Sequence, residues 1–78
     1  SMKLSLKIKV DSQDNSKILD FEKILNKTDL IYNFFITKFD KDYTYYQIIF
    51  NGTPKNFLNS MTENSLYFNT QNKIWILK

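Results

Sequence analysis

The sequence predicts an α+β domain in which two helices cover one face of an antiparallel sheet. Residues 3–10 alternate strictly between polar and apolar side chains, which is the period of a half-buried strand. Residues 30–39 and 43–50 are rich in β-branched and aromatic residues and are separated by a short polar turn, which indicates a hairpin. Two segments with apolar residues at helical spacing, one before and one after this hairpin, complete the pattern.

The first strand has one apolar and one cationic face. Its apolar face carries Leu4, Leu6, Ile8 and Val10. Its polar face carries Lys3, Ser5, Lys7 and Lys9. Only one of these faces can pack against a core, so the lysines are expected to face away from it.

Capping residues bracket both predicted helices. The first begins at an N-cap, Asn15 or Ser16, and ends at Lys27, with Ile18, Phe21, Ile24 and Leu25 on its apolar side. The second begins with Thr53 as N-cap and Pro54 at the first helical position, and Asn64 is a candidate left-handed cap at its end.

Two short strands are expected after the second helix. They are residues 66–68 and 74–77, with a polar turn at 69–73. The element order is then that of two split βαβ units, which form a ferredoxin-like βαββαβ sandwich. We expect a four-stranded antiparallel sheet, both helices on one face, and a short extra C-terminal hairpin strand. Residues 3–78 form a single domain, and Ser1-Met2 is interpreted as an expression scar.

The composition excludes most covalent and metal chemistry. The 78 residues include no Cys or His, and therefore offer no thiolate, no Ser-His relay and none of the usual zinc ligands. The acid pairs Asp11/Asp14 and Asp40/Asp42 are interpreted as solvated turns, because each has too few oxygen ligands for a calcium loop. We therefore expect no enzyme activity and no cofactor. Abundant Ile, Asn, Lys, Phe and Tyr, without Arg or Ala, resemble the bias of an AT-rich genome.

The uncovered face of the sheet is a candidate binding surface. It is expected to carry Lys3, Lys7, Lys9, Phe35 and Tyr45, a mixture of cations and aromatic rings that suits single-stranded RNA. The RNA-recognition signature is poorly matched, since only Lys41, Tyr43 and Tyr45 fit it. Nucleic acid is therefore the alternative to a protein partner.

The last strand points to a protein interface. Ile74-Trp75-Ile76-Leu77 is apolar on both faces, so one face is left uncovered unless a partner hides it. The candidate interface residues are Tyr45, Gln47, Ile49, Ile74, Trp75 and Ile76.

A spaced set of aliphatic and aromatic residues over about residues 18–78 resembles a known domain type. The set runs from Leu19-Asp20-Phe21 through the hairpin, Asn51-Gly52 and Phe57-Leu58 to Trp75-Ile76-Leu77. It resembles the small ferredoxin-like C-terminal domain of uncharacterised alphaproteobacterial envelope proteins. The resemblance implies an accessory domain of a larger bacterial protein, in the periplasm or envelope, without a metal-binding Cys pair.

Together these patterns predict a non-catalytic protein-interaction or assembly module. Its partner is expected to be the parent chain or a second copy in a weak homodimer, and a single-stranded RNA-binding domain is the alternative. No run approaches the roughly 18 apolar residues of a membrane span, so no membrane insertion is expected. Without the resemblance, a cytoplasmic module is the alternative location.

Overall fold

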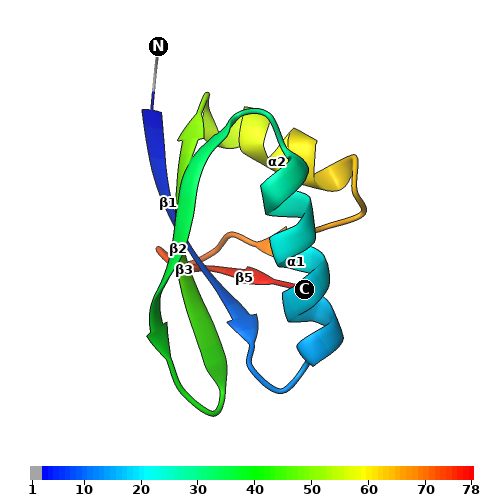
Figure 1. Cartoon of the computed structure of the whole chain (residues 1–78). Coiled ribbons are helices and arrows are strands. Elements are labelled where there is room, and N and C mark those ends of the chain that lie inside the picture. The colour runs from blue at the N-terminus through cyan, green and yellow to red at the C-terminus, as the bar shows by residue number, and fades with distance from the viewer. Residues whose placement is uncertain (1–2) are drawn as a thin grey trace.

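The computed structural model describes residues 3–78 (Figure 1), and the Ser1-Met2 pair interpreted as an expression scar lies outside the described residues. The α+β class is confirmed. The elements in order are β1 (Lys3–Asp11), α1 (Asn15–Lys27), β2 (Ile31–Phe39), β3 (Tyr43–Asn51), α2 (Pro54–Thr62), β4 (Phe68–Asn69) and β5 (Trp75–Leu77). Both helices lie on the same side of the sheet, as expected (Figure 1).

The sheet differs from the four-stranded antiparallel sheet of the ferredoxin-like prediction. It has five strands in the order β2-β3-β1-β5-β4. The pairs β1·β3, β2·β3 and β4·β5 are antiparallel, whereas β1 and β5 run parallel. The first four elements therefore follow the predicted topology. The strand after α2 does not return beside β1, because β5 occupies that position and β4 is displaced to the edge.

The apolar character of each strand explains this arrangement. β5 is apolar at every position, and an interior place beside β1 pairs its backbone on both sides. β4 has only the buried Phe68 and the polar Asn69, which suits a short edge strand. In the ladder Trp75 pairs with Ile8, and Phe68 pairs with Leu77. β5, the more apolar of these two strands, is thus the one that takes the interior position beside β1.

A chain of aromatic rings joins the two helices to the sheet. Phe57 of α2 lies 5.3 Å from Phe50, 5.8 Å from Phe68 and 6.3 Å from Trp75, measured between ring centroids. Phe21 of α1 lies 5.2 Å from the Tyr46 ring in an edge-to-face contact. Such pairs add to the free energy gained from burying their area. The aliphatic part of the core consists of Leu6, Ile8, Val10, Ile24, Leu25, Ile48, Met61, Leu66 and Leu77, and Phe68 is buried with them.

The helix ends follow the capping rules with small shifts from prediction. Asp14, rather than Asn15 or Ser16, caps α1, and its carboxylate accepts the N–H of Lys17 at 3.0 Å. Thr53 caps α2 in a capping box with Asn56, which confirms the predicted start. The left-handed residue after α2 is Ser65, with φ of 60°, one position beyond the predicted Asn64.

In residues 3–78 no helix is both long and apolar enough to cross a membrane.

Candidate binding surfaces

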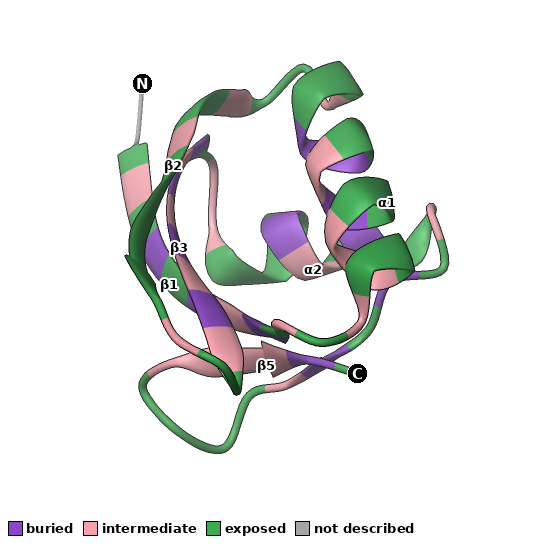
Figure 2. Ribbon diagram, turned by 60° about the horizontal axis from the view of Figure 1, so that its bottom comes forward, coloured by how far each residue is buried: buried purple, intermediate pink, exposed green. Residues whose placement is uncertain are grey.

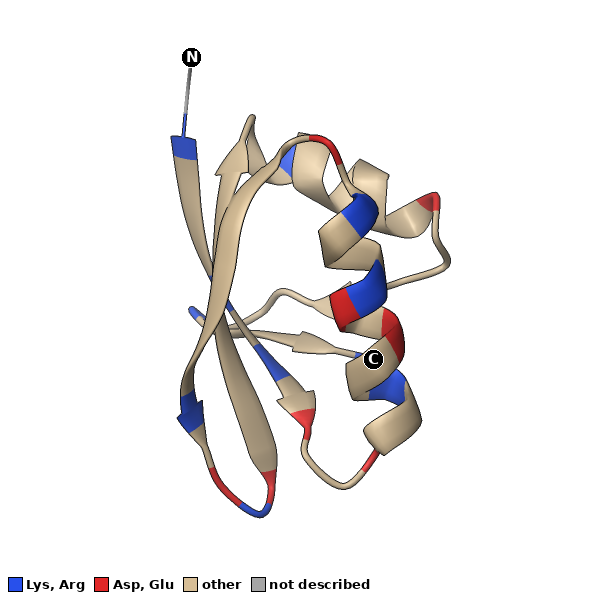
Figure 3. Cartoon of the chain, viewed as in Figure 1, with Lys and Arg blue, Asp and Glu red and all other residues tan. Residues whose placement is uncertain are grey.

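The face of the sheet turned away from α1 and α2, here called the open face, combines lysines with aromatic rings. Register places Lys9 opposite Tyr45 and Lys7 opposite Gln47 on the paired strands β1 and β3. Further members are found from the same registers: Lys3, Ser5, Phe35, Lys38, Tyr43, Ile49 and Ile76. Figure 3 shows lysines along β1 and near the end of β2, while α1 carries charges of each sign. The cationic character of the first strand is thus displayed on this face.

A groove of about 270 Å³ lies in the middle of the open face. Its walls come from three strands and the loop before β5, and include Lys7, Lys38, Tyr45, Gln47 and Ile74. Two ammonium groups, one phenol ring and one amide therefore converge on a partly apolar depression. Gln47 is held in place by a hydrogen bond of 2.6 Å that its amide nitrogen donates to the Ser5 hydroxyl.

Lysine ammonium groups of this face lie over tyrosine rings. The Lys9 ammonium is 4.3 Å from the Tyr43 centroid, and the Lys38 ammonium is 4.8 Å from the Tyr45 centroid. The Lys9 ammonium also lies 5.9 Å from the Tyr45 centroid, so that ring has cations from two strands beside it. Each such contact is worth about 0.5–1 kcal/mol at an exposed site. The contacts orient the lysines across the face.

At the other end of the sheet, Lys3 extends the same pattern. Its ammonium lies 3.8 Å from the ring centroid of Tyr32 in β2, two strands away. Tyr32 is 68 % exposed. The row of cations and rings therefore runs the length of β1.

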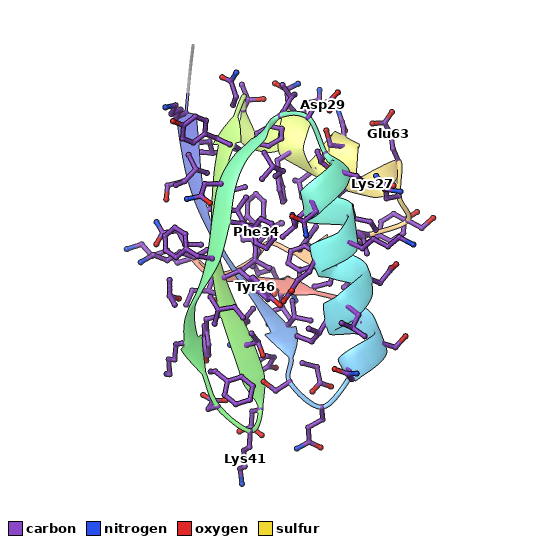
Figure 4. All side chains as sticks on the ribbon, viewed as in Figure 1. Lys27, Asp29, Phe34, Lys41, Tyr46 and Glu63 are labelled. Atoms are coloured by element: carbon purple, nitrogen blue, oxygen red, sulfur yellow. The ribbon has the colours of Figure 1, made fainter. Side chains whose placement is uncertain are left out.

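The acidic side chains near this face shape turns. The Asp40 carboxylate accepts the N–H groups of Asp42 at 2.9 Å and Tyr43 at 2.8 Å. These hydrogen bonds, together with the nearby Lys38 and Lys9, hold the pKa of the Asp40 carboxyl below its usual range. Figure 4 shows Lys41 at the tip of the same hairpin. Asp40 thus closes the turn between β2 and β3.

The other acid pair also bonds to the backbone. Asp11 accepts the N–H of Gln13 at 2.9 Å, and Asp14 caps α1. Within residues 3–78 no three acidic side chains group closely enough to hold a metal ion. The acids of these loops are therefore occupied with local structure.

Tyr46 is the strongly shifted titratable group of the described residues, and it faces the helices. Its hydroxyl donates a 2.5 Å hydrogen bond to the Glu22 carboxylate of α1. Burial raises the pKa of Tyr46 strongly, and the bond to Glu22 adds to the shift. Figure 4 shows Tyr46 and Phe34 between the sheet and α1. This pair links helix to sheet and lies away from the open face.

A second surface, the β2 edge, is defined here as five exposed residues of the edge strand and the position before it: Leu30, Tyr32, Phe35, Ile36 and Phe39. These are five of the seven large hydrophobic side chains exposed among residues 3–78, with exposed fractions from 43 % at Leu30 to 71 % at Phe39. β2 ends the strand order of the sheet, and Figure 2 shows it largely exposed. Exposed apolar groups gathered on an unpaired strand are characteristic of interaction surfaces.

The structure separates the residues of the predicted interface. Tyr45, Gln47, Ile49, Ile74 and Ile76 lie on the open face, with Ile76 beside Lys9 in the ladder. Trp75 lies on the opposite side, where its ring is 6.4 Å from Phe68, and it is half-buried. The residues of the alternative nucleic-acid surface, Lys3, Lys7, Lys9, Phe35 and Tyr45, all lie on the open face.

Several exposed residues were not singled out from the sequence. These are Tyr32, Ile36, Lys38 and Phe39 of β2. The signal is that β2 has apolar side chains on both faces, Tyr32 and Phe35 on one and Phe34 and Ile36 on the other, unlike β1. An unpaired edge strand of that composition must expose apolar groups.

Comparisons with protein-family models, with curated proteins and with solved structures gave no match to this chain. The resemblance to an alphaproteobacterial envelope domain therefore stays a prediction.

Proposed function

We propose that this domain is a non-catalytic interaction and assembly module that associates through the β2 edge. The observation that carries the proposal is the concentration of exposed apolar side chains on the edge strand and at the residue before it: Leu30, Tyr32, Phe35, Ile36 and Phe39. The non-catalytic part is supported by the acids, since Asp11, Asp14 and Asp40 each accept backbone N–H groups. The role as an accessory domain of a larger bacterial protein rests on the resemblance alone.

Charge favours the edge over the open face for self-association. A symmetric dimer built face to face on the open side would bring Lys3, Lys7, Lys9 and Lys38 of each copy together. Like charges facing one another oppose association. β2 carries a single lysine, Lys38, so edge pairing meets much less repulsion.

The β2 sequence is self-complementary in an antiparallel register centred on Phe35. In that register Phe34 lies opposite Ile36, and Ile31 lies opposite Phe39, each pair on the helix side of the sheet. Tyr32, whose ring contacts Lys3, would meet Lys38 of the second copy on the open side. Cross-strand apolar and cation–aromatic pairs of this kind stabilise antiparallel sheets.

The resulting dimer is expected to be weak. Register shifts between Ile31 and Asn33 and between Ile36 and Lys38 interrupt the strand and limit regular pairing. Hiding the exposed parts of Phe35, Ile36 and Phe39 contributes roughly 1 kcal/mol per side chain. Association itself costs at least about 4 kcal/mol. With the added backbone bonds, a dissociation constant on the order of 0.1–1 mM follows.

Sedimentation velocity from micromolar to millimolar protein tests the proposal. The native chain should shift toward dimer over this range, and Ile36→Lys should stay monomeric because it places a charge in the centre of the pairing. Leu19→Lys is the matched control, since Leu19 is 60 % exposed on α1, and it should dimerise like the native chain. A native chain that remains monomeric at millimolar concentration, or equal loss in both variants, contradicts association through β2.

A further inference from the structure

The open face concentrates positive charge on a flat surface. Lys3, Lys7 and Lys9 occupy three of the four open-face positions 3, 5, 7 and 9 of β1, where neighbouring side chains of one face lie about 6.8 Å apart. Lys38 lies two strands away, roughly 10 Å across the sheet. Among residues 3–78, the acids placed near this face are Asp11 and those of the Asp40 turn, at one end of it. The middle of the face therefore complements a polyanion.

Aromatic rings lie between these cations. Tyr45 stands between Lys9 and Lys38, with ammonium-to-centroid distances of 5.9 and 4.8 Å. Phe35 pairs with Gln47, two residues from Tyr45 along β3 and on the same face, and it is 45 % exposed. A base that stacks on Tyr45 would take the place of an ammonium group at the ring, and that ammonium group would then be free to meet a phosphate.

The groove of about 270 Å³ joins both features in one place. Lys7 and Lys38 stand on opposite sides of it, and Tyr45, Gln47 and Ile74 form the rest of its lining. A carboxylate-bearing peptide could pair with the lysines, but its carboxylates would not stack on the aromatic rings. A duplex could satisfy the lysines, but its bases are already stacked within the helix. The combination fits a chain that alternates phosphates with unpaired bases.

We propose that the open face binds single-stranded nucleic acid, with bases stacked on Tyr45 and Phe35 and phosphates at Lys7, Lys9 and Lys38. The affinity combines phosphate contacts with base stacking, and it depends little on base sequence because stacking does not read base edges. Stacking on bases and ion pairing with phosphates do not involve the 2′-hydroxyl, so RNA and DNA strands are expected to bind alike. Phe35 and Lys38 belong both to this site and to the edge used for association, whereas Lys7, Lys9 and Tyr45 lie on β1 and β3, away from that edge.

Fluorescence anisotropy with labelled oligo(U) and oligo(dT) of about twelve nucleotides tests the site. We expect micromolar affinity at low salt. Three phosphate contacts give a slope of log affinity against log salt of about −2, so the affinity should fall roughly 20-fold from about 50 to about 200 mM salt. Lys7→Gln and Lys9→Gln should each weaken binding several-fold and flatten the slope by about 0.7.

Matched variants distinguish base stacking and binding at this face from attraction by the overall charge of the chain. Tyr45→Leu should weaken binding by tenfold or more, whereas Tyr45→Phe, which keeps the ring, should bind like the native chain. Lys23→Gln removes the same charge from the exposed side of α1 and should leave the affinity unchanged at high salt and nearly so at low salt. Circular dichroism confirms that each variant is folded.

Three results would overturn the proposal. The first is no binding of either strand at low salt. The second is an equal loss in Lys23→Gln and Lys7→Gln, which would indicate non-specific charge attraction. The third is competition by polyglutamate as effective as that by unlabelled oligo(U), which would identify an acidic-peptide surface instead.

Discussion

The orientation of β5 makes a sharp prediction about two adjacent residues. Trp75 packs on the helix side, 6.3 Å from Phe57 and 6.4 Å from Phe68 between ring centroids. Ile76 faces the open side and pairs with Lys9. Trp75→Lys should therefore destabilise the domain much more than Ile76→Lys, although both replace a half-buried apolar side chain with the same cation.

The expected magnitude follows from the burial. Replacing a fully buried Trp or Phe by Ala costs about 3–5 kcal/mol. Trp75 is half-buried, so we expect a loss of about 2 kcal/mol from its contacts alone, and an ammonium placed beside Phe57 and Phe68 can only add to it. Ile76→Lys loses less area and leaves the new charge in solvent, for a cost of about 1 kcal/mol or less. A chain of 78 residues has a total stability of about 4–12 kcal/mol, so the first change removes a large part of it.

Thermal unfolding followed by far-ultraviolet circular dichroism measures the difference. At about 4–8 °C per kcal/mol for a domain of this size, Trp75→Lys should lower Tm by roughly 8–16 °C or prevent folding. Ile76→Lys should lower Tm by no more than about 8 °C. If Ile76→Lys proves the more damaging of the two, then β5 faces the other way and the parallel register with β1 is refuted.

Three further outcomes follow from individual contacts. Because the pKa of Tyr46 is raised in the fold, its stabilising contribution is complete below the ordinary phenol pKa of about 10 and is lost as the pH rises above it. Between about pH 7 and about pH 11, the free energy of unfolding in urea should therefore fall less for Tyr46→Phe than for the native chain. An equal fall in both proteins would contradict this. Gly52→Ala should destabilise by about 1–3 kcal/mol in urea unfolding, because the new Cβ would lie 2.7 Å from the Phe50 ring; an unchanged midpoint would show that the ring moves freely. Carbon-detected NMR should show that the pKa of Asp40 lies below the usual range of an aspartate. The stability that its turn contributes is then present above an ordinary carboxyl pKa and is lost only on further acidification. A normal titration midpoint would mean that the turn is open in solution.

Local sequence patterns predicted the elements well, because each depends on neighbours in the chain. The alternation of β1 and the cap at Thr53 specify a strand and a helix start without reference to the rest of the fold. The hairpin is specified by its composition and by the short turn at Asp40. The faces predicted for Lys7 and Tyr45 followed from the same alternation.

The arrangement at the C-terminus could not be predicted in this way. Which strand lies beside β1 is decided by competition between Phe68–Asn69 and Trp75–Leu77 for one interior position, and that competition involves the whole core. Alternation also cannot orient a strand that is apolar on both faces, so the sequence pattern did not determine which side of the sheet Trp75 takes. It is decided by the rings of Phe57 and Phe68, which are distant in sequence.

The two proposed surfaces are compatible because association extends the sheet at its β2 edge, whereas nucleic acid binds on its open face. Antiparallel pairing of β2 with a second β2 keeps Phe35 on the open side of both copies, since the register matches like faces. The symmetry axis then runs perpendicular to the sheet, and the two open faces lie on one side of a continuous surface. The lysines of β1 stay outside the interface, separated from it by β3. Association at the edge would thus lengthen the cationic face instead of covering it, whereas face-to-face pairing would remove it.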